Sequence, residues 1–505
     1  MTASAVSTSQ IDLSWQASTD NVGVVGYRVL RDGQLQGSTA STAFQSSGLA
    51  AATRYSFTVQ ALDAAGNASA VSTAAAATTL SSAPPSGGRV LSANPTNYAS
   101  IVPTLVAGDT LVLEPGNYAD SSMPGLRLRD LNGTAAAPIL IMGDPSKARP
   151  VLRGRGDVNT VRFGNSSYIV LRHLEVDSLN LGGDGVRADG VAHHITLEDL
   201  VVKNAGPDQA TVAISTNGGT TWNWTIRRCI IDGAGTGMYL GNSDGDVPFI
   251  AGTIENNLII NTIGYNIEVK HQLASRYPTI AGMPAGPNVT IIRNNVFHKS
   301  SNSSTGDSAR PNLLVGSFPL SGPGSQDRYD IYGNFFYQNP VERLFQGEGN
   351  FSFHHNLLVN TQGDALSVQP HNGQVRTIRI FNNTVIANGV GIGVSGGASG
   401  YSQKVIGNAV FAPTPLSGGE QIGNQTDTMA NASKHVVNAT PVIGQLDLFP
   451  RDGALQGAAI DRTGLNIYTD WDRDFNALTQ GATFRGAYGA AGTNPGWRPA
   501  LQLKP

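Results

Sequence analysis

The sequence predicts an all-β protein in two parts, a small N-terminal β-sandwich and a long right-handed parallel β-helix. Short runs of alternating apolar and polar residues fill the first 79 residues, residues 80–88 are rich in Pro, Gly and Ser, and an Asn-containing unit recurs from about residue 159 onward. Only 14% of the 505 residues are charged and 60 are glycine, a composition that favours many strands and tight turns over long surface helices.

Composition and charge narrow the range of partners. The net charge is −3 and no long block of one sign occurs, so the sequence makes no case for binding nucleic acid or an anionic membrane. No apolar run approaches the roughly 18 residues of a transmembrane helix. The single cysteine, Cys229, lies in an apolar run, and we expect it to be a buried side chain rather than a nucleophile. We expect the chain to act as a monomer.

The first 79 residues predict the β-sandwich. Apolar and polar residues alternate, as in half-buried strands, in residues 11–15, 26–30 and 55–59. The segment resembles a fibronectin type III module of the kind appended to bacterial chitinases and cellulases. The resemblance makes Trp15 the core tryptophan and Tyr55 the tyrosine that fixes a corner between strands, and it implies a spacer or accessory role. Residues 80–88 are typical of a linker.

A recurring unit predicts the fold of residues 89–505. The unit is a short apolar strand, a turn and a second strand that an Asn precedes, as in Ile292-Arg293-Asn294-Asn295-Val296-Phe297. This Asn recurs at positions 257, 295, 334, 356, 383 and 408, with spacings of 38, 39, 22, 27 and 25 residues. Such spacing is typical of a parallel β-helix in which each coil carries loops of variable length.

The recurring Asn residues have a structural explanation. Asn tolerates the left-handed backbone conformation at a turn, and stacked Asn side chains can form hydrogen bonds from one coil to the next. We expect residues 89–158 to form the N-terminal cap and first coils. Residues from about 446 to 505 resemble the closing segment of bacterial β-helix proteins.

Because side chains fill the inside of such a coil, a polymeric substrate has to lie along the outside. We take the strand after each Asn unit and place its apolar residues inward, which fixes the polar residues that face outward. These are Arg187, Asp189, Tyr239, Glu268, Lys270, Arg310, Asn312, Ser367 and Gln369, with His371 just beyond. In register, five of them form one groove: Arg187, Tyr239, Glu268, Lys270 and Arg310.

Carboxylates near this groove predict a metal site. Asp244 and Asp246 follow the Tyr239 strand, one coil before Glu268, and clustered oxygen ligands suit Ca²⁺. A plain Asx-rich turn explains the two aspartates equally well. Glu268 beside Lys270 in an apolar strand indicates either a functional placement or a surface ion pair worth under ~1 kcal/mol.

Residues 237–315 resemble the catalytic region of the alginate lyase and chondroitinase B family of parallel β-helix lyases. The motifs that carry the resemblance are Asn266-Ile267-Glu268-Val269-Lys270, Ile292-Arg293-Asn294-Asn295-Val296-Phe297 and Ser308-Ala309-Arg310. It implies that Glu268 is a Ca²⁺ ligand, Lys270 the base and Arg310 the acid or charge stabiliser. The chain departs from the family where Asn266 and Glu268 replace paired glutamates, where the Lys stands closer to them, and where residues 271–287 are inserted.

The resemblance also implies a reaction on an anionic polysaccharide that yields an unsaturated uronide. Ca²⁺ or Arg neutralises a uronate carboxylate, and Lys270, with a lowered pKa, removes the proton on the adjacent carbon. Arg310, Tyr239 or His271 then assists departure of the 4-linked oxygen. The residues assigned to substrate binding are Arg187, Asp189, Arg276, Gln369 and His371. Because no signal peptide is visible, a secreted, extracellular location is expected from the resemblance alone.

Two other functions remain open at the level of sequence. A glycoside hydrolase on the same scaffold needs two carboxylates facing each other across the groove. The carboxylates that could serve are Asp189, Asp244, Asp246, Glu268 and Glu348. In a carbohydrate-binding or adhesion protein, the coils would only present a surface. The N-terminal module favours a carbohydrate ligand or substrate, but it does not distinguish between the lyase, the hydrolase and the binding protein.

Overall fold

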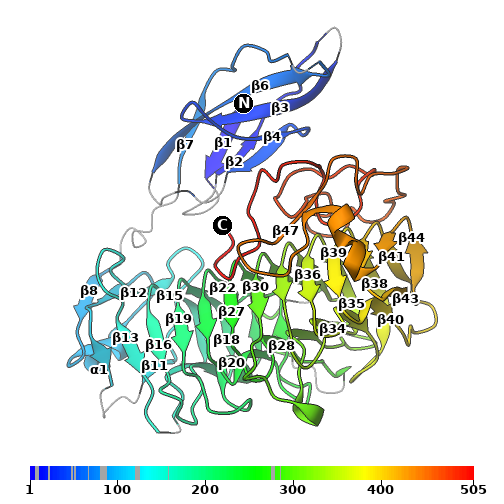
Figure 1. Cartoon of the computed structure of the whole chain (residues 1–505). Coiled ribbons are helices and arrows are strands. Elements are labelled where there is room, and N and C mark those ends of the chain that lie inside the picture. Colours follow the sequence, from blue (N-terminus) through cyan, green and yellow to red (C-terminus); the bar gives the residue numbers. More distant parts are fainter. Residues whose placement is uncertain are drawn as a thin grey trace. The chain divides into compact units, whose positions relative to one another are not determined.

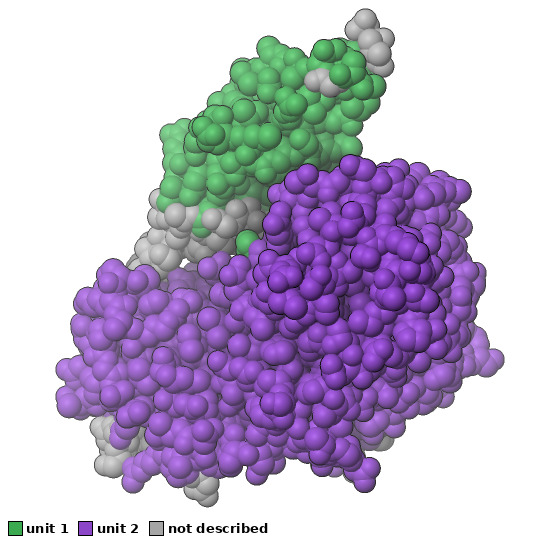
Figure 2. All heavy atoms as spheres, in the orientation of Figure 1, with its two compact units in different colours: residues 1–84, 472–481, 505 green, residues 85–471, 482–504 purple. Residues whose placement is uncertain are grey.

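The computed structural model divides the chain into two compact units (Figure 2). One unit comprises residues 1–84 with 472–481 and 505, and the other comprises residues 85–471 with 482–504. The structure describes residues 1–5, 11–20, 23–46, 49, 53–65, 67–79, 88–119, 125–156, 158–274, 279–284 and 286–505. No helix in this described part is long and apolar enough to cross a membrane.

The N-terminal residues form two antiparallel sheets, as the alternating pattern predicts. One sheet contains β1 (Thr2–Ala5), β2 (Ile11–Ser14) and β5 (Ala43–Ser46), and the other contains β4 (Gln34–Thr39), β3 (Val24–Arg31), β6 (Arg54–Asp63) and β7 (Ala75–Thr78). Their core consists of Ile11, Leu13, Val29, Leu49, Phe57 and Val59. Trp15 packs against this core, which confirms its predicted position.

From β8 onward the chain forms a parallel β-helix (Figure 1). Successive strands pass in turn through three parallel sheets of fifteen, twelve and eleven described strands, which we call sheets 1, 2 and 3. A coil therefore contributes strands to all three sheets, and its inward side chains stack on those of the next coil. This architecture confirms the predicted fold class.

The strands of the three sheets have the following bounds. Sheet 1 contains β8 (Val90–Ala93), β9 (Thr110–Leu113), β12 (Ile139–Gly143), β15 (Ser166–Arg172), β18 (Ala192–Glu198), β21 (Thr221–Trp222), β22 (Thr225–Arg227), β25 (Phe249–Ile250), β26 (Thr253–Glu255), β29 (Val289–Arg293), β32 (Arg328–Tyr332), β35 (Gly349–His354), β38 (Val375–Phe381), β41 (Gln403–Ile406) and β44 (Glu420–Ile422). Sheet 2 contains β10 (Asn117–Tyr118), β13 (Val151–Arg153), β16 (Glu175–Asp177), β19 (Val201–Lys203), β23 (Ile230–Asp232), β27 (Leu258–Ile260), β30 (Val296–His298), β33 (Phe335–Tyr337), β36 (Leu357–Asn360), β39 (Thr384–Ala387), β42 (Ala409–Phe411) and β45 (Gln425–Asp427). Sheet 3 contains β11 (Leu126–Arg129), β14 (Val161–Gly164), β17 (Val186–Asp189), β20 (Val212–Gly218), β24 (Thr236–Leu240), β28 (Ile267–Val269), β31 (Leu313–Val315), β34 (Phe345–Gly347), β37 (Leu366–Val368), β40 (Val390–Val394) and β43 (Thr414–Ser417).

A ladder of buried Asn side chains joins the coils at the turn between sheets 1 and 2. Each Asn donates from Nδ2 to Oδ1 of the next, at 2.9–3.0 Å, through Asn257, Asn295, Asn334, Asn356, Asn383, Asn408 and Asn424. The preceding residue is often left-handed, with φ of 54° at Asn256 and 55° at Asn294. The predicted hydrogen bonding from coil to coil is confirmed, whereas the left-handed conformation falls on the residue before the ladder Asn. Asn424 extends the ladder by one coil.

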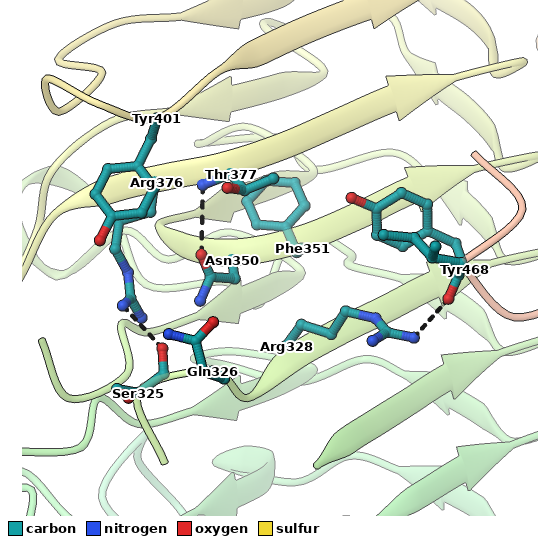
Figure 3. A pocket seen from close by; sticks show the side chains of 10 residues that line it. Ser325, Gln326, Arg328, Asn350, Phe351, Arg376, Thr377, Tyr401 and Tyr468 are labelled. Carbon is teal, nitrogen blue, oxygen red and sulfur yellow. Dashed lines mark hydrogen bonds between the residues drawn. The ribbon is translucent and has the colours of Figure 1, made fainter. Parts of the chain in front are cut away.

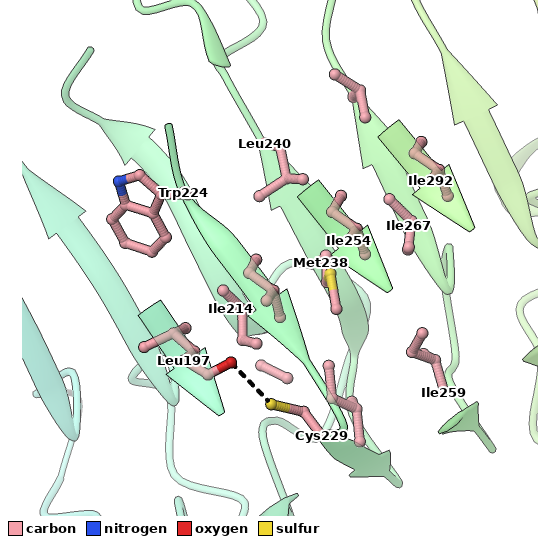
Figure 4. Close-up of a cluster of buried hydrophobic side chains, with 14 of the residues drawn as sticks. Leu197, Ile214, Trp224, Cys229, Met238, Leu240, Ile254, Ile259, Ile267 and Ile292 are labelled. Carbon is pink, nitrogen blue, oxygen red and sulfur yellow. Dashed lines mark hydrogen bonds between the residues drawn. The ribbon is translucent and has the colours of Figure 1, made fainter. Parts of the chain in front are cut away.

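The interior between the sheets is apolar and continuous (Figure 4). Cys229 lies in this interior, fully buried, and its backbone N–H donates to Asn257 Oδ1 at 2.9 Å. Cys229 thus takes the place of an Asn one coil before the ladder begins. Burial raises the pKa of its thiol to about 12, which confirms the prediction of an unreactive side chain.

Short helices and an irregular tail complete the second unit. The helices are α1 (Tyr98–Ile101), η1 (Val102–Thr104), η3 (Gly306–Ser308) and η4 (Met429–Lys434), and an antiparallel pair follows, β46 (Val436–Asn438) with β47 (Asp447–Pro450). The tail runs back along the coils (Figure 1). Asn382 Nδ2 donates to the carbonyl of Phe484 at 3.3 Å, and Asn256 Nδ2 donates to that of Lys504 at 3.1 Å. The closing segment therefore also covers the turns between sheets 1 and 2.

Candidate functional site

The outward positions of sheet 3 form a continuous row across the coils. In β28, Ile267 and Val269 are fully buried, so Glu268 between them points to the outside of the coil. Strand pairing continues this position through Arg127, Arg162, Arg187, Ser215, Tyr239, Glu268, Leu314, Gln346 and Ser367. The predicted alignment of Arg187, Tyr239 and Glu268 is therefore confirmed.

Arg310 and Asn312 were predicted to lie on this outward face, but neither is part of the row. β31 begins only at Leu313, so Arg310 belongs to the preceding loop, which follows η3. Asn312 is fully buried and accepts a hydrogen bond from Asn339 Nδ2 at 3.1 Å. The outward placement of Asn312 is wrong, because this residue is a turn amide that bonds to the next coil rather than a strand residue.

Glu268 and Lys270 form an ion pair beside Tyr239. Lys270 Nζ lies 2.8 Å from Glu268 Oε1 and 5.4 Å from the centre of the Tyr239 ring. The Tyr239 hydroxyl lies 2.6 Å from Ser243 Oγ in the turn that follows β24. Glu268 is only 2% exposed, so this pair is buried and differs from the solvated surface pair considered above.

The charges of this pair contradict the lowered pKa expected for Lys270. Burial alone would lower that pKa, but the adjacent charge of Glu268 and the hydrogen bond to it raise the pKa of Lys270 above its usual value. Burial raises the pKa of Glu268, and Lys270 only partly offsets this effect. Lys270 is therefore protonated at neutral pH.

Glycines lie on both sides of Lys270 along the direction of coil stacking. A Cβ atom on Gly241 would lie 3.2 Å from Lys270 Cβ, and Gly241 has a φ of +87° that favours glycine. A Cβ atom on Gly316 would lie 2.4 Å from the backbone N of His271, which is too close. At these two positions, therefore, the neighbouring coils carry no side chain beside Lys270.

Arg310 supplies a second cation near the pair. Its guanidinium lies 5.8 Å from the centre of the Tyr265 ring, and Nη1 donates to the carbonyls of Asp307 and Ala309, both at 2.8 Å. Within the described part of the chain, no carboxylate forms an ion pair with it. The charge of Arg310 lowers the pKa of nearby Glu268, so the structure brings Arg310 to the predicted cluster.

A buried lysine that the sequence analysis missed fixes the backbone of Arg310. Lys299 is 1% exposed, and its Nζ donates to the carbonyls of Gly264 at 2.6 Å and of Arg310 at 3.0 Å. Burial, together with the charge of Arg310, lowers the pKa of Lys299 to about 7. Lys299 follows β30 directly, and no local pattern marks it as buried.

His271 and Gln272 are buried immediately after Lys270. His271 Nδ1 has no hydrogen-bond partner among the described residues, and neither has the side-chain amide of Gln272. Burial, and then the charge of Lys270, lowers the pKa of His271, so its imidazole is neutral at neutral pH. Unpartnered polar atoms that are buried at one place need an explanation, and a bound substrate offers one.

Glu348 holds the loop that carries His371. Its carboxylate accepts hydrogen bonds from four backbone N–H groups, those of Ser317, His371, Asn372 and Gly373. The charge of His371 lowers the pKa of Glu268, so this loop reaches the same cluster. Glu348 is thereby a structural carboxylate.

Gln369 and Gln346 extend the cluster along sheet 3. Gln369 Oε1 lies 3.2 Å from Ser367 Oγ and accepts from Arg343 Nη1 at 3.4 Å. Gln346 lies on the outward row between Leu314 and Ser367 and was missed, although the alternation in Phe345-Gln346-Gly347 could have identified it.

Arg187 lies in this row and binds Asp189, which stands two residues further along β17. Arg187 Nε donates to Asp189 Oδ1 at 3.0 Å and Nη1 donates to Asp184 Oδ2 at 2.9 Å, while Asp189 also pairs with Arg162. The group lies two strands before Tyr239, or about 10 Å at the usual strand spacing. Its role in substrate binding stays a prediction.

The residues predicted to hold Ca²⁺ do not fit the ion together. Asp246 Oδ1 accepts from Asn242 Nδ2 at 2.6 Å, as in an Asx-rich turn, and Glu268 is paired with Lys270. Across the described ranges, no group of three or more His, Cys, Asp or Glu side chains is arranged to hold a metal ion. The third predicted ligand, Asp244, does not complete such a group. Arg276 lies outside the described residues.

Two family models match parts of the chain. Residues 1–76 match the fibronectin type III domain, and residues 210–410 match the right handed beta helix region. The fold therefore defines an all-β protein in which a fibronectin type III domain precedes a right-handed parallel β-helix.

Curated relatives share short segments with the chain. Chitinase Chi52 of Paenibacillus xylanexedens is 55% identical over 73 residues, which are 14% of each chain. Chitinase A1 of Niallia circulans is 44% identical over 102 residues, which are 20% of this chain and 14% of that protein. Gellan lyase of Bacillus sp is 47% identical over 57 residues, which are 11% of this chain and 2% of that protein. The chain thus spans 14% or less of the length of these relatives.

Solved structures include distant likenesses. The pectate lyase Pel9A has a TM-score of 0.43 and 12% identity over 80% of this chain and 96% of that chain. The alginate lyase from Paenibacillus sp. str. FPU-7 has a TM-score of 0.31 and 15% identity over 67% of this chain and 99% of that chain. A family 28 exopolygalacturonase of Yersinia enterocolitica has a TM-score of 0.28 and 13% identity, over 84% of this chain and 95% of that chain.

Proposed function

We propose that this protein is a secreted polysaccharide lyase, which cleaves a uronate-containing polysaccharide by β-elimination in the groove on sheet 3. The observation that carries the proposal is the cluster of a protonated Lys270, a neutral His271 and an Arg310 without a carboxylate partner in the described chain. Such a set offers a proton donor, a proton acceptor and a site for a carboxylate within one groove.

The charge states assign the steps to different residues from those that the family resemblance implies. Arg310 pairs with the uronate carboxylate, which acidifies the proton on C5. The neutral His271 accepts this proton as the C5–H bond breaks and the C4–C5 double bond forms. Lys270 gives a proton to O4 as the C4–O4 bond breaks, with Tyr239 beside it. No water is consumed, and the products are an unsaturated uronide and a new sugar hydroxyl.

The relatives support polysaccharide as the substrate class and an extracellular location. The chitinases that share a segment with this chain act on chitin as their names state, and gellan lyase acts on gellan. Because enzymes of different specificity share this module, it supports a polysaccharide substrate in general and does not identify a particular glycan. Among the described residues, no group of three or more His, Cys, Asp or Glu side chains is arranged for the calcium that the family resemblance implies, and no step of the proposed reaction uses it.

The structure offers little support for the hydrolase alternative. Hydrolysis by paired carboxylates needs two free groups across the groove. Glu268, Asp189 and Asp246 are engaged with neighbouring side chains, and Glu348 is engaged with backbone N–H groups.

The test is incubation of the whole chain with alginate, pectate, chondroitin and glucuronan. We expect the ultraviolet absorbance of an unsaturated uronide to rise with one of them, and Lys270→Gln to abolish the rise. Lys404→Gln is the matched control, because it removes a Lys–Glu pair on sheet 1. New reducing ends without absorbance would establish the hydrolase instead. Binding without any product would establish the non-catalytic alternative.

A further inference from the structure

A cavity of about 200 Å³ opens on sheet 1 (Figure 3). Its walls are β32, β35, β38 and two residues of the tail. The residues that line it are Ser325, Gln326, Arg328, Asn350, Phe351, Arg376, Thr377, Tyr401, Ile467 and Tyr468. Drug-sized ligands occupy pockets of roughly 300 Å³ or more, so this volume suits a single sugar residue.

A β-bulge lies in the wall of the cavity. Gly349 pairs with Val375 and Phe351 pairs with Ile378, so Arg376 and Thr377 together face Asn350. At the bulge, the N–H of Thr377 donates to Asn350 Oδ1 at 3.4 Å. Bulges of this kind often redirect a side chain next to a functional site.

The bulge buries a cation that no carboxylate of the described residues neutralises. Arg376 is 1% exposed, and Nη1 donates to the carbonyls of Ser325 at 3.0 Å and of Pro319 at 3.3 Å. Its Nε has no hydrogen-bond partner within the described ranges. Arg328 is different, because Asp330 lies 3.0 Å away and neutralises it. The cavity thus carries one uncompensated positive charge, which favours an anionic ligand.

Aromatic and amide side chains surround this charge. Tyr401 is 41% exposed and its ring centre lies 5.9 Å from the Arg376 guanidinium, while the ring centre of Tyr468 lies 5.5 Å from that of Arg328. Gln326 and Asn350 add amide groups at the rim. Flat aromatic faces with a few polar groups suit a ligand that has an apolar ring face and hydroxyls at its edge.

We infer that this cavity is a second binding site, which takes one acidic sugar residue of a polysaccharide through its carboxylate. The charge of Arg376 selects the carboxylate, the Tyr401 ring covers the sugar face, and the amides bind hydroxyls. The inference rests on the residues of this cavity and stands apart from the reaction proposed for sheet 3. A polymer bound in this cavity is held at a place separate from the site of cleavage.

The experiment is calorimetric titration of the Lys270→Gln chain with methyl glucuronoside, methyl galacturonoside and methyl glucoside. We expect a uronoside to bind and the neutral glucoside to bind more weakly. Tyr401→Ala should weaken uronoside binding about threefold to tenfold, the range for loss of one aromatic contact. Arg379→Ala is the control, because Arg379 lies on the same strand outside the cavity and donates to Ser402.

A second pair of variants isolates the charge. Arg376→Lys keeps the cation and should retain preference for the uronoside, whereas Arg376→Met should lose it. If Arg376→Met does not fold, Gln326→Ala at the exposed rim takes its place in the comparison with Tyr401→Ala. Equal binding of glucoside and uronoside, no binding of either, or binding that Tyr401→Ala and Gln326→Ala leave unchanged would overturn the inference. Lyase activity is measured separately with Lys270 unaltered. This measurement distinguishes a failure of the proposed binding site from a failure of the reaction proposed for sheet 3.

Discussion

At the level of single residues, the charge of Lys270 decides which step this side chain can perform. The family resemblance implies a lowered pKa for Lys270. Glu268 stands two positions earlier, in β28, which ends at Val269, and the alternating pattern predicts that both side chains face outward. Their burial comes from residues on other coils, which no local pattern reveals. Burial strengthens the attraction within the pair, and the pKa of Lys270 rises instead.

The pH dependence of cleavage follows from these directions. His271 has to be neutral and its pKa is lowered from 6.5, so kcat/KM should fall only below that pH. Lys270 has to be protonated and its pKa is raised from 10.5, so no alkaline fall is expected below that pH. His271→Gln should lower kcat about 10²- to 10⁴-fold, the usual loss for a general base. A wild-type alkaline limb near neutral pH would contradict the assignment of Lys270 as donor.

A buried histidine links folding to acid pH. His354 is fully buried, with its ring centre 4.9 Å from that of Tyr332 and 4.4 Å from that of Phe381. Burial lowers its pKa to about 3, against about 6.5 in the unfolded chain, so protonation favours unfolding between these values. Stability is fully present above pH 6.5 and should decline by up to about 1.4 kcal/mol per pH unit below it.

The variant His354→Phe keeps a stacked ring and removes the titration. We expect its free energy of unfolding, measured with urea at pH 7 and pH 5, to differ less between the two pH values than in the wild type. Phe381→Leu is the control, since it weakens the stack without changing a titratable group. An unchanged pH difference in His354→Phe would show that other groups cause the acid sensitivity.

At the level of elements, the Asn ladder explains why the coil was predictable. The spacing of the recurring Asn predicts one buried amide per coil, and each of the six predicted residues is in the ladder. The phase of β28 was also predictable, because Ile267 and Val269 alternate with polar neighbours. Arg310 was misplaced because the strand begins three residues later, after Pro311, and turn amides such as Asn312 look like strand residues in sequence.

The ladder makes a graded prediction about stability. Asn334→Ala removes the acceptor of the Asn295 N–H and the Nδ2 donor to the carbonyl of Ile292. It also removes one of the two hydrogen bonds that Asn295 Nδ2 donates. We expect a loss of about 3 kcal/mol in the free energy of unfolding, since each buried unsatisfied group costs about 1–3 kcal/mol. Asn424→Ala at the partly buried end of the ladder should cost about 1 kcal/mol, because water can replace the lost bonds. Equal losses in urea unfolding would contradict a role that depends on burial.

At the level of the whole molecule, the division into two apolar cores was predictable from the sequence, whereas the path of the C-terminal tail was not. The apolar core of the β-helix draws on residues from Ala93 to Ala412, and the core of the N-terminal sheets draws on Ile11 to Val59. A change of pattern after residue 79 predicts this division. The path of the tail was not predictable, since Lys504 binds Asn294 and Gly333 across some 170 to 210 residues of chain. Contacts of that length depend on the finished fold and leave no periodic signal.

Separate cores predict separate unfolding. A chain of residues 85–505 keeps the whole apolar core of the β-helix, so its unfolding temperature in calorimetry should match the main transition of the full chain. Its turnover of a soluble oligosaccharide should also be unchanged, because every group assigned to the sheet 3 groove lies in the second unit. Removal of residues 482–505 is the contrasting deletion. It takes away the bonds of Lys504 to Asn294 and Gly333, and it should lower the unfolding temperature of the β-helix. If removal of residues 1–84 lowers that temperature as much as removal of the tail does, the two cores are coupled rather than independent.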